Sequence, residues 1–157
     1  MKAALVLTLV VVSACKQEQS ASPTPATSPT PAKDKHFTVS FSGQPATVGD
    51  AARLSLRLVA TDGFHVNADY PVSFVPDESP AVAFAAPRVP LKDTAAKTPC
   101  AGSAEDTCAL DATLSPKAVA AGTHRVSGVF AFSVCSADQC LIEKEPVSLQ
   151  LVVSAPQ

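Results

Sequence analysis

Val126-Ser-Gly-Val-Phe-Ala-Phe-Ser-Val-Cys135-Ser-Ala-Asp-Gln-Cys140-Leu-Ile142 combines an alternating apolar segment, a short polar segment and two cysteines. Its large apolar side chains recur at every second position up to the first cysteine, which is the side-chain period of a β-strand. Residues 136–139 then separate the two cysteines by four small or polar positions, an ordinary length for a hairpin loop. The segment therefore predicts a β-hairpin whose strands meet the loop at Cys135 and Cys140.

The two hairpin cysteines are predicted to lie opposite each other on neighbouring strands. Directly opposed Cβ atoms in an antiparallel pair are about 4.5–5.5 Å apart, a small adjustment from disulfide distance. A bridge across so short a loop stabilises a fold little, and strained or exposed bridges are the reactive ones. The acidic residues Asp138, Glu143 and Glu145 lie nearby in the sequence and would disfavour a thiolate. A redox-active pair and a purely structural disulfide are therefore both open interpretations of Cys135 and Cys140.

Residues 36–157 are expected to form one domain rich in short strands. Apolar or alternating runs occur at 37–41, 52–58, 64–67, 70–75, 81–89, 110–114 and 147–153, with turn residues between them. One helical turn is expected at 115–122, from the Ser-Pro-Lys start to the closing glycine. This pattern predicts an all-β fold, an antiparallel β-sandwich, with a small closed barrel as the alternative.

The first 14 residues are predicted to be a signal peptide. Lys2 supplies the charged start, and the apolar run Ala3–Val12 is too short to span a bilayer as a stop-transfer helix. The run ends in Val12-Ser-Ala-Cys15, which resembles the bacterial lipobox, where signal peptidase cuts before a cysteine that carries lipid. An ordinary signal peptide with an incidental cysteine is the alternative. On the lipobox interpretation, acyl chains on Cys15 hold the protein on a membrane.

Residues 15–35 are predicted to be a disordered linker behind the lipid anchor. This segment is rich in Pro, Ser and Thr, and it offers no packing side chain larger than alanine. It therefore cannot bury enough surface to offset the entropy cost of ordering. The chain as a whole carries a formal net charge of −2 at pH 7, so nothing in it suggests a nucleic-acid partner.

Export to an oxidising compartment makes disulfides the expected state of the remaining cysteines. Cys100 and Cys108 flank the polar loop 101–107, and a local structural disulfide between them is the favoured interpretation. Exchange with the hairpin pair is the alternative, because four cysteines allow three connectivities. His36, His65 and His124 come from three separate segments without ligand spacing, and His65 is expected to be a packed or half-exposed strand residue. We predict no metal site and no cofactor.

Two patches of the chain resemble a known family. They are Asp62-Gly-Phe-His-Val-Asn67 followed by Val72-Ser-Phe-Val-Pro76, and Phe132-Ser-Val-Cys-Ser-Ala-Asp-Gln-Cys-Leu141. Together they resemble the amino-terminal periplasmic domain of the thiol:disulfide reductase DsbD, over about residues 36–153. The resemblance implies an immunoglobulin-like sandwich with its redox pair at Cys135 and Cys140. It also implies a loop near residues 93–107 that covers the pair.

The resemblance also implies a function. Such a domain would take electrons from a membrane reductase and pass them to periplasmic, thioredoxin-like thiol proteins through the hairpin cysteines. The alternative is a non-catalytic binding or assembly lipoprotein whose disulfides are purely structural. In either case the expected location is the bacterial cell envelope, with the lipid anchor in a membrane and the domain in the periplasm or at the cell surface.

Overall fold

The fold was analysed in a computed structural model that describes residues 35–156. The predicted signal peptide, the lipidation site at Cys15 and the linker up to residue 34 lie outside the described residues. Within 35–156 the structure is all-β and contains no helix, which confirms the all-β class expected from the sequence. It follows that no described segment is a helix long and apolar enough to cross a membrane.

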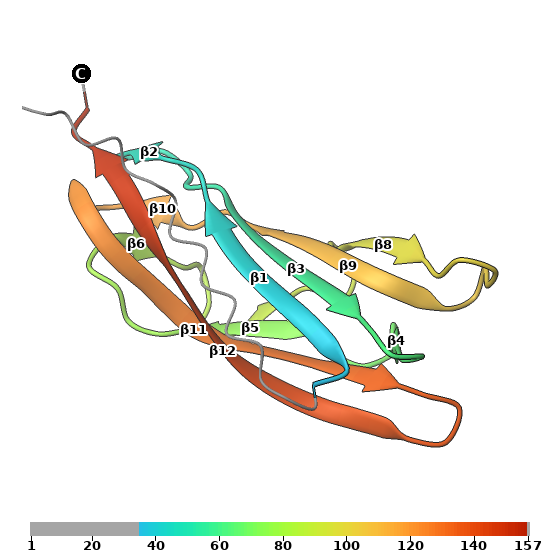
Figure 1. Cartoon of the computed structure of the whole chain (residues 1–157). Coiled ribbons are helices and arrows are strands. Elements are labelled where there is room, and N and C mark those ends of the chain that lie inside the picture. The colour runs from blue at the N-terminus through green and yellow to red at the C-terminus, as the bar shows by residue number, and fades with distance from the viewer. Residues whose placement is uncertain (1–34, 157) are drawn as a thin grey trace, which may run out of the picture.

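Twelve strands make up the described part of the chain. They are β1 (Phe37–Gly43), β2 (Ala46–Thr47), β3 (Leu54–Ala60), β4 (His65–Val66), β5 (Ser73–Pro76), β6 (Val82–Ala83), β7 (Val89–Pro90), β8 (Ala96–Pro99), β9 (Thr107–Leu114), β10 (Lys117–Ala118), β11 (Gly122–Cys135) and β12 (Cys140–Ser154). Most of them are short, and the hairpin of β11 and β12 is by far the longest element (Figure 1).

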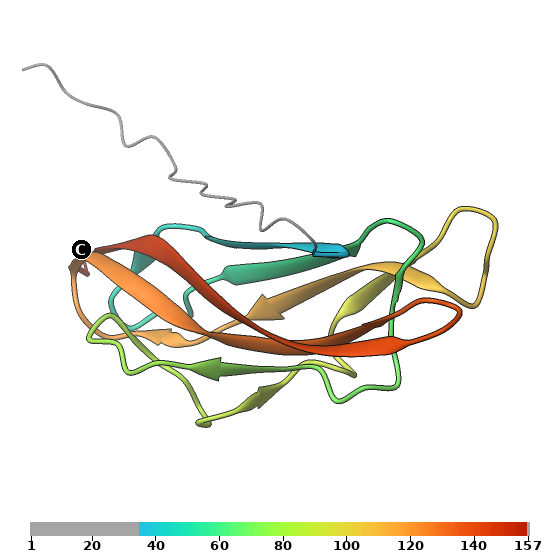
Figure 2. The same ribbon diagram turned by 60° about the horizontal axis from the view of Figure 1, so that its bottom comes forward.

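Ten of these strands form one curled sheet. Its main order is β1-β3-β9-β4-β11-β12-β2, with β5 also pairing β11, β7 pairing β5, and β8 pairing β9. β10 and β6 form a separate two-stranded sheet. The main sheet folds over so that β1, at one end of the order, lies alongside β12 (Figure 1). Figure 2 shows the result as two layers, with β1 and β3 on one side and β5 and β11 on the other.

The apolar core fills the space between these layers. β3 alternates between buried leucines and exposed polar residues, as its sequence predicts: Leu54, Leu56 and Leu58 are all fully buried. From the other side Phe74 of β5 and Phe130 of β11 are also fully buried. Each such side chain contributes about 1.5–3 kcal/mol when it is removed from water. The core therefore holds the sheet together independently of any disulfide.

Gly128 is required where β11 passes over β5. The register pairs Gly128 with Pro76, and the neighbouring β5 residues crowd the missing side chain. A Cβ atom added at Gly128 would lie 2.5 Å from Cζ of Phe74 and 2.5 Å from the carbonyl oxygen of Val75. No side chain other than glycine fits this contact without movement of the backbone, so Gly128 allows Phe74 to reach the core.

Two local expectations from the sequence are wrong. The helical turn expected at 115–122 is instead extended chain: Lys117 and Ala118 form β10 and pair with Ala83 and Val82. The strand expected at 81–89 is split into β6 and β7, which belong to different sheets. The cause in the first case is tertiary: the backbone groups of Ala118 bond to Asp50 and Gly49, which a local helical turn would not allow.

Candidate functional site

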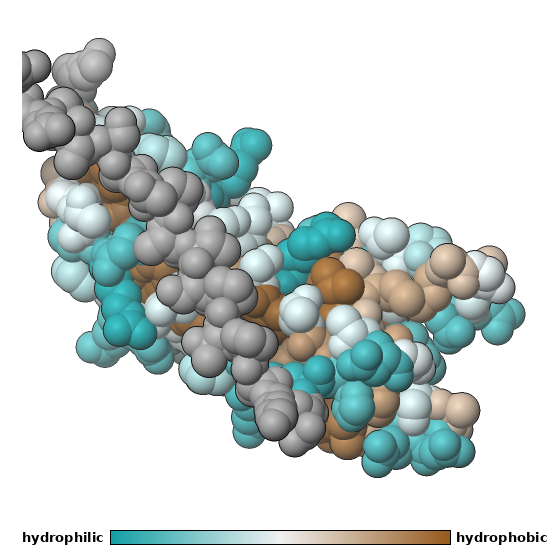
Figure 3. Space-filling view, viewed as in Figure 1, coloured by the Kyte–Doolittle hydropathy of each residue, from teal (hydrophilic) through white to brown (hydrophobic). Residues whose placement is uncertain are grey.

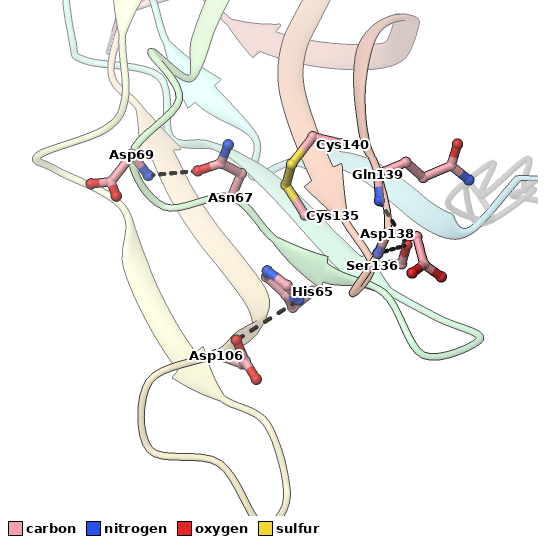
Figure 4. Close-up of a disulfide and its surroundings, with 9 residues drawn as sticks. All are labelled: His65, Asn67, Asp69, Asp106, Cys135, Ser136, Asp138, Gln139 and Cys140. Atoms are coloured by element: carbon pink, nitrogen blue, oxygen red, sulfur yellow. Dashed lines mark hydrogen bonds and ion pairs between the residues drawn. A yellow bond between two sulfur atoms is a disulfide. The ribbon is translucent and has the colours of Figure 1, made fainter.

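The structure places Cys135 and Cys140 opposite each other at the end of the long hairpin. They are the last pair in the antiparallel register of β11 and β12, and a disulfide joins them with a Cα–Cα distance of 4.0 Å. The alternation of the sequence predicted this arrangement, because each strand ends on the cysteine that borders the loop. Figure 4 shows the bridge with the loop residues beside it.

The loop that follows the bridge is closed by its own hydrogen bonds. The Ser136 amide donates to the Gln139 carbonyl oxygen at 2.8 Å, and the Ser136 hydroxyl oxygen accepts from the amides of Asp138 and Gln139 at 3.3 Å each. A serine that accepts from the amides two and three positions later is a common way to organise a tight turn. The two cysteines are therefore held opposite each other by the hydrogen-bonded backbone of the hairpin as well as by the bond between their sulfurs.

The two cysteines differ sharply in exposure. Cys135 is 6% exposed, whereas Cys140 is an exposed residue. The order of the sheet explains the difference. Beyond Cys135 lies β4, since His65 pairs with Cys135 in the register of β11 and β4. Beyond Cys140 no described strand is paired, because β2 meets β12 only at Val153 and Ser154. An incoming group can approach Cys140 from this free edge.

Ile142 lies on the same exposed side of β12 as Cys140. The residues of β12 alternate between exposed and partly buried positions from Cys140 onwards, so Cys140, Ile142 and Lys144 share one face. Ile142 is 64% exposed, which is the highest value among the exposed large apolar residues in the described part of the chain. An apolar side chain and then a cationic one thus follow the accessible sulfur along the strand.

Cys100 and Cys108 form the second disulfide, with a Cα–Cα distance of 4.7 Å. It closes the loop between β8 and β9, as the favoured interpretation of the sequence predicted. The loop is also organised internally, because the Cys100 amide donates to the Asp106 carbonyl oxygen at 2.8 Å and the Asp106 amide to the Ser103 hydroxyl at 3.2 Å.

The loop near 93–107 does not cover the hairpin pair, which corrects the expectation drawn from the resemblance. Residues 96–99 are strand β8, which pairs with β9. β4 stands between β9 and β11, so this whole segment is separated from Cys135 by one strand. Figure 3 shows the hairpin and the β8–β9 loop as two arms that stand apart, with hydrophilic residues near both tips.

The short strand β4 brings His65 between the two disulfides. On one side His65 pairs with Cys135 of β11. On the other side Val66 pairs with Thr107, so the position beside His65 on β9 is that of Cys108. His65 also lines a cavity of about 340 Å³, together with Cys100, Cys108 and Asp106. The order across this face of the sheet is therefore Cys140, Cys135, His65 and Cys108.

Sequence reasoning did not recognise His65 as part of the site. It was predicted to be a packed or half-exposed strand residue, and its side chain is indeed 31% exposed. What the sequence did not show is which strand pairs with β4. The one available signal was its position in the Asp62–Asn67 patch, which carries half of the resemblance to the DsbD domain.

The other histidines lie elsewhere. His36 stacks on Phe64 with ring centroids 4.1 Å apart, and His124 Nε2 is 3.1 Å from the Ala121 carbonyl oxygen. Within residues 35–156 there is no group of three or more His, Cys, Asp or Glu side chains placed to hold a metal ion.

A scan against protein-family models, a search of curated proteins and a search of solved structures each find no match to this chain.

Proposed function

We propose that the protein is an envelope lipoprotein whose domain exchanges disulfides with thioredoxin-like proteins through Cys135 and Cys140. On this proposal the fold is an immunoglobulin-like relative of the amino-terminal domain of DsbD, and the chain passes electrons from a membrane reductase to periplasmic thiol proteins. The observation that carries the proposal is the unequal exposure of one cross-strand bridge: Cys140 is exposed and Cys135 is 6% exposed. Such a bridge exposes one sulfur to an attacking thiolate and protects the other.

The chemistry follows from this asymmetry. A thiolate of the electron donor attacks Cys140 Sγ, a bond forms between the two sulfurs, and the Cys135–Cys140 bond breaks with Cys135 leaving as a thiolate. A second thiol of the donor then displaces Cys140 and completes the donor's own disulfide. Two electrons and two protons have now passed to the domain, which holds two thiols.

Delivery to a client runs the same steps in reverse. Cys140 attacks a client disulfide and forms a mixed disulfide, and the client's other sulfur leaves as a thiolate. Cys135 then attacks Cys140 Sγ, which restores the domain's bridge and releases the reduced client. The hairpin favours this second step, because its hydrogen-bonded backbone also holds Cys135 and Cys140 opposite each other.

Two measurements test the proposal. The first is the reduction potential of the hairpin bridge in glutathione buffers, and we expect it to lie above about −300 mV, the range of resistant structural disulfides. The second is trapping with a purified thioredoxin as the defined probe. Cys135→Ser removes the thiol of the domain that would resolve a mixed disulfide. Mixed with a thioredoxin variant that keeps only its attacking cysteine, activated beforehand as a mixed disulfide with a good leaving thiol, free Cys140 should displace that thiol and accumulate a mixed disulfide with thioredoxin.

The mirror variant is the matched control. Cys140→Ser leaves only the buried Cys135, so we expect much less trapped complex at equal protein concentration. A potential below about −300 mV together with no trapping by either variant would leave the purely structural interpretation, that of a binding or assembly lipoprotein.

The anchor is a separate part of the proposal. Its support is the small-residue sequence before Cys15, together with two disulfides that agree with an oxidising compartment. Intact-mass spectrometry of the mature protein should show acyl chains at Cys15. Cys15→Ser should lose that mass and move the protein out of the membrane fraction; a mature wild-type chain without acyl mass would refute the anchor and leave the exchange chemistry untouched.

A further inference from the structure

We propose that His65 is the acid–base partner of Cys135, supplying and removing the proton that the buried sulfur needs during exchange. This inference rests on the proposed function, since it concerns a proton that moves only if the hairpin bridge opens. It assigns a role to a residue that is far from both cysteines in the sequence. The juxtaposition of His65 and Cys135 is created by the pairing of β4 with β11.

The register brings the two side chains together. Cys135 and His65 are directly opposed in the antiparallel pair of β11 and β4, so they emerge on the same face of the sheet. Directly opposed Cβ atoms are about 4.5–5.5 Å apart, which places an imidazole and a thiol within reach of each other. The neighbouring register pair, Val134 with Val66, consists of two buried residues and fixes β4 against β11.

Asp106 is the carboxylate that lies beside the imidazole. Its Oδ1 atom lies 3.8 Å from His65 Nδ1, and the two side chains come from adjacent segments of the sheet. Figure 4 shows His65 between Asp106 and the Cys135–Cys140 bridge. Because Nδ1 is the ring nitrogen nearer to Asp106, we assign the proton exchange with Cys135 to Nε2.

The surroundings of His65 hold few other charged groups. The turn before β4 contributes Asp62 to the same cavity, and the β8–β9 loop contributes Asp106. β11 and β12 face His65 with Cys135 and, one strand further, Cys140. β3 contributes Ala60, and no lysine or arginine lines the cavity. His65 is therefore the one basic residue that lines this cavity, and on its other side the register pairs it with Cys135.

The proton balance is as follows. When a donor thiolate opens the bridge at Cys140, Cys135 leaves with the bonding electron pair, and protonated His65 gives its Nε2 proton to Cys135 Sγ. In the client direction neutral His65 takes the proton from the Cys135 thiol. The resulting thiolate attacks Cys140 Sγ, and the client sulfur leaves with the electron pair of the mixed disulfide.

The size of the effect follows from thiol chemistry. An ordinary cysteine thiol, with a pKa near 8.5, is about 3% ionised at pH 7, so a neighbouring base can raise the reactive fraction by at most about 30-fold. Removing His65 should therefore slow the resolving step at pH 7 by roughly three- to 30-fold. The loss should fade at higher pH, where an ordinary thiol ionises without help.

The test uses the full chain with the variants Cys15→Ser and Cys140→Ser, in which Cys135 is the free thiol and the second bridge stays intact. Thiolate formation is followed by its ultraviolet absorbance as the pH is raised. We expect His65→Phe, and independently His65→Gln, to shift half-ionisation of Cys135 to higher pH. The matched control is His124→Phe, on β11, the strand that also carries Cys135; it should leave the ionisation profile unchanged. Two substitutions at His65 keep the test valid if one of them does not fold.

The kinetic readout separates this proposal from the one it rests on. A glutathione mixed disulfide is formed at Cys140, and its release by Cys135 is measured between pH 6 and 9. We expect slower release in the His65 variants at the acidic end and equal release at the alkaline end. An unchanged ionisation profile and pH dependence in both folded His65 variants would overturn the role of His65, even with normal trapping by Cys135→Ser. Failed trapping in that variant would instead refute the exchange function itself.

Discussion

Reducing the Cys135–Cys140 bridge should leave the domain folded. The bridge spans a sequence separation of 5, and the chain-entropy relation for so short a loop gives a stabilisation of about 2 kcal/mol. Against this, all 14 residues of β11 are paired with β12, and the fully buried Phe130 and Phe132 each contribute about 1.5–3 kcal/mol. The hairpin is therefore held by its ladder and its core, and the bridge is a minor part of its stability.

The assay is equilibrium unfolding in urea of the full chain, oxidised and after treatment with a phosphine reductant. The variant Cys135→Ala/Cys140→Ala removes only the hairpin bridge. The variant Cys100→Ala/Cys108→Ala removes only the other bridge, whose sequence separation of 8 predicts a stabilisation of about 2.5 kcal/mol. We expect a single cooperative transition in each case and similar losses for the two bridges. Unfolding on reduction, or a loss above about 4 kcal/mol for the hairpin bridge alone, would refute this reasoning and would favour a structural staple.

Gly128→Ala should cost about 2–3 kcal/mol or more in urea unfolding, because its Cβ would lie 2.5 Å from a backbone oxygen. Gly43→Ala should cost less, because its Cβ would meet only leucine side chains, the nearest methyl group at 3.0 Å. Ile142→Lys should lower the rate of mixed-disulfide formation with thioredoxin several-fold in stopped-flow measurements, with an unchanged urea midpoint, because the side chain is 64% exposed beside Cys140. Arg57→Ala should cost less than about 1 kcal/mol, and less still in high salt, since its 2.7 Å ion pair with Asp111 is solvent-exposed.

The sequence was a good guide where pairing is local. The alternation up to Cys135 and the four-residue loop were enough to predict the hairpin, because a short loop fixes the register of the strands on both sides of it. The same holds for the loop between Cys100 and Cys108, where the bridge joins residues of sequence separation 8. In both cases the partners are neighbours in the chain, so no knowledge of the rest of the fold was needed.

The sequence was a poor guide where pairing is distant. Nothing near Lys117 indicates that it will pair with Ala83, and a Ser-Pro-Lys start is equally typical of a helical turn. The two-residue strand β4 has too few positions to show any period, yet it joins two long strands and carries His65. Short strands acquire their structure from their partners, and this is why the position of His65 could not be predicted.

The environment of the hairpin sulfurs is set by neighbours across the sheet more than by neighbours in the sequence. Sequence proximity suggested that acidic residues would disfavour a thiolate. In the structure, Glu145 pairs with Lys35 at 2.5 Å, and Asp138 is exposed on the loop. The residue opposite Cys135 in the sheet is His65, the residue that we propose as its proton partner. A charge argument built on the linear sequence thus leaves out His65, because a β-sheet places side chains from distant segments closer together than those along one strand.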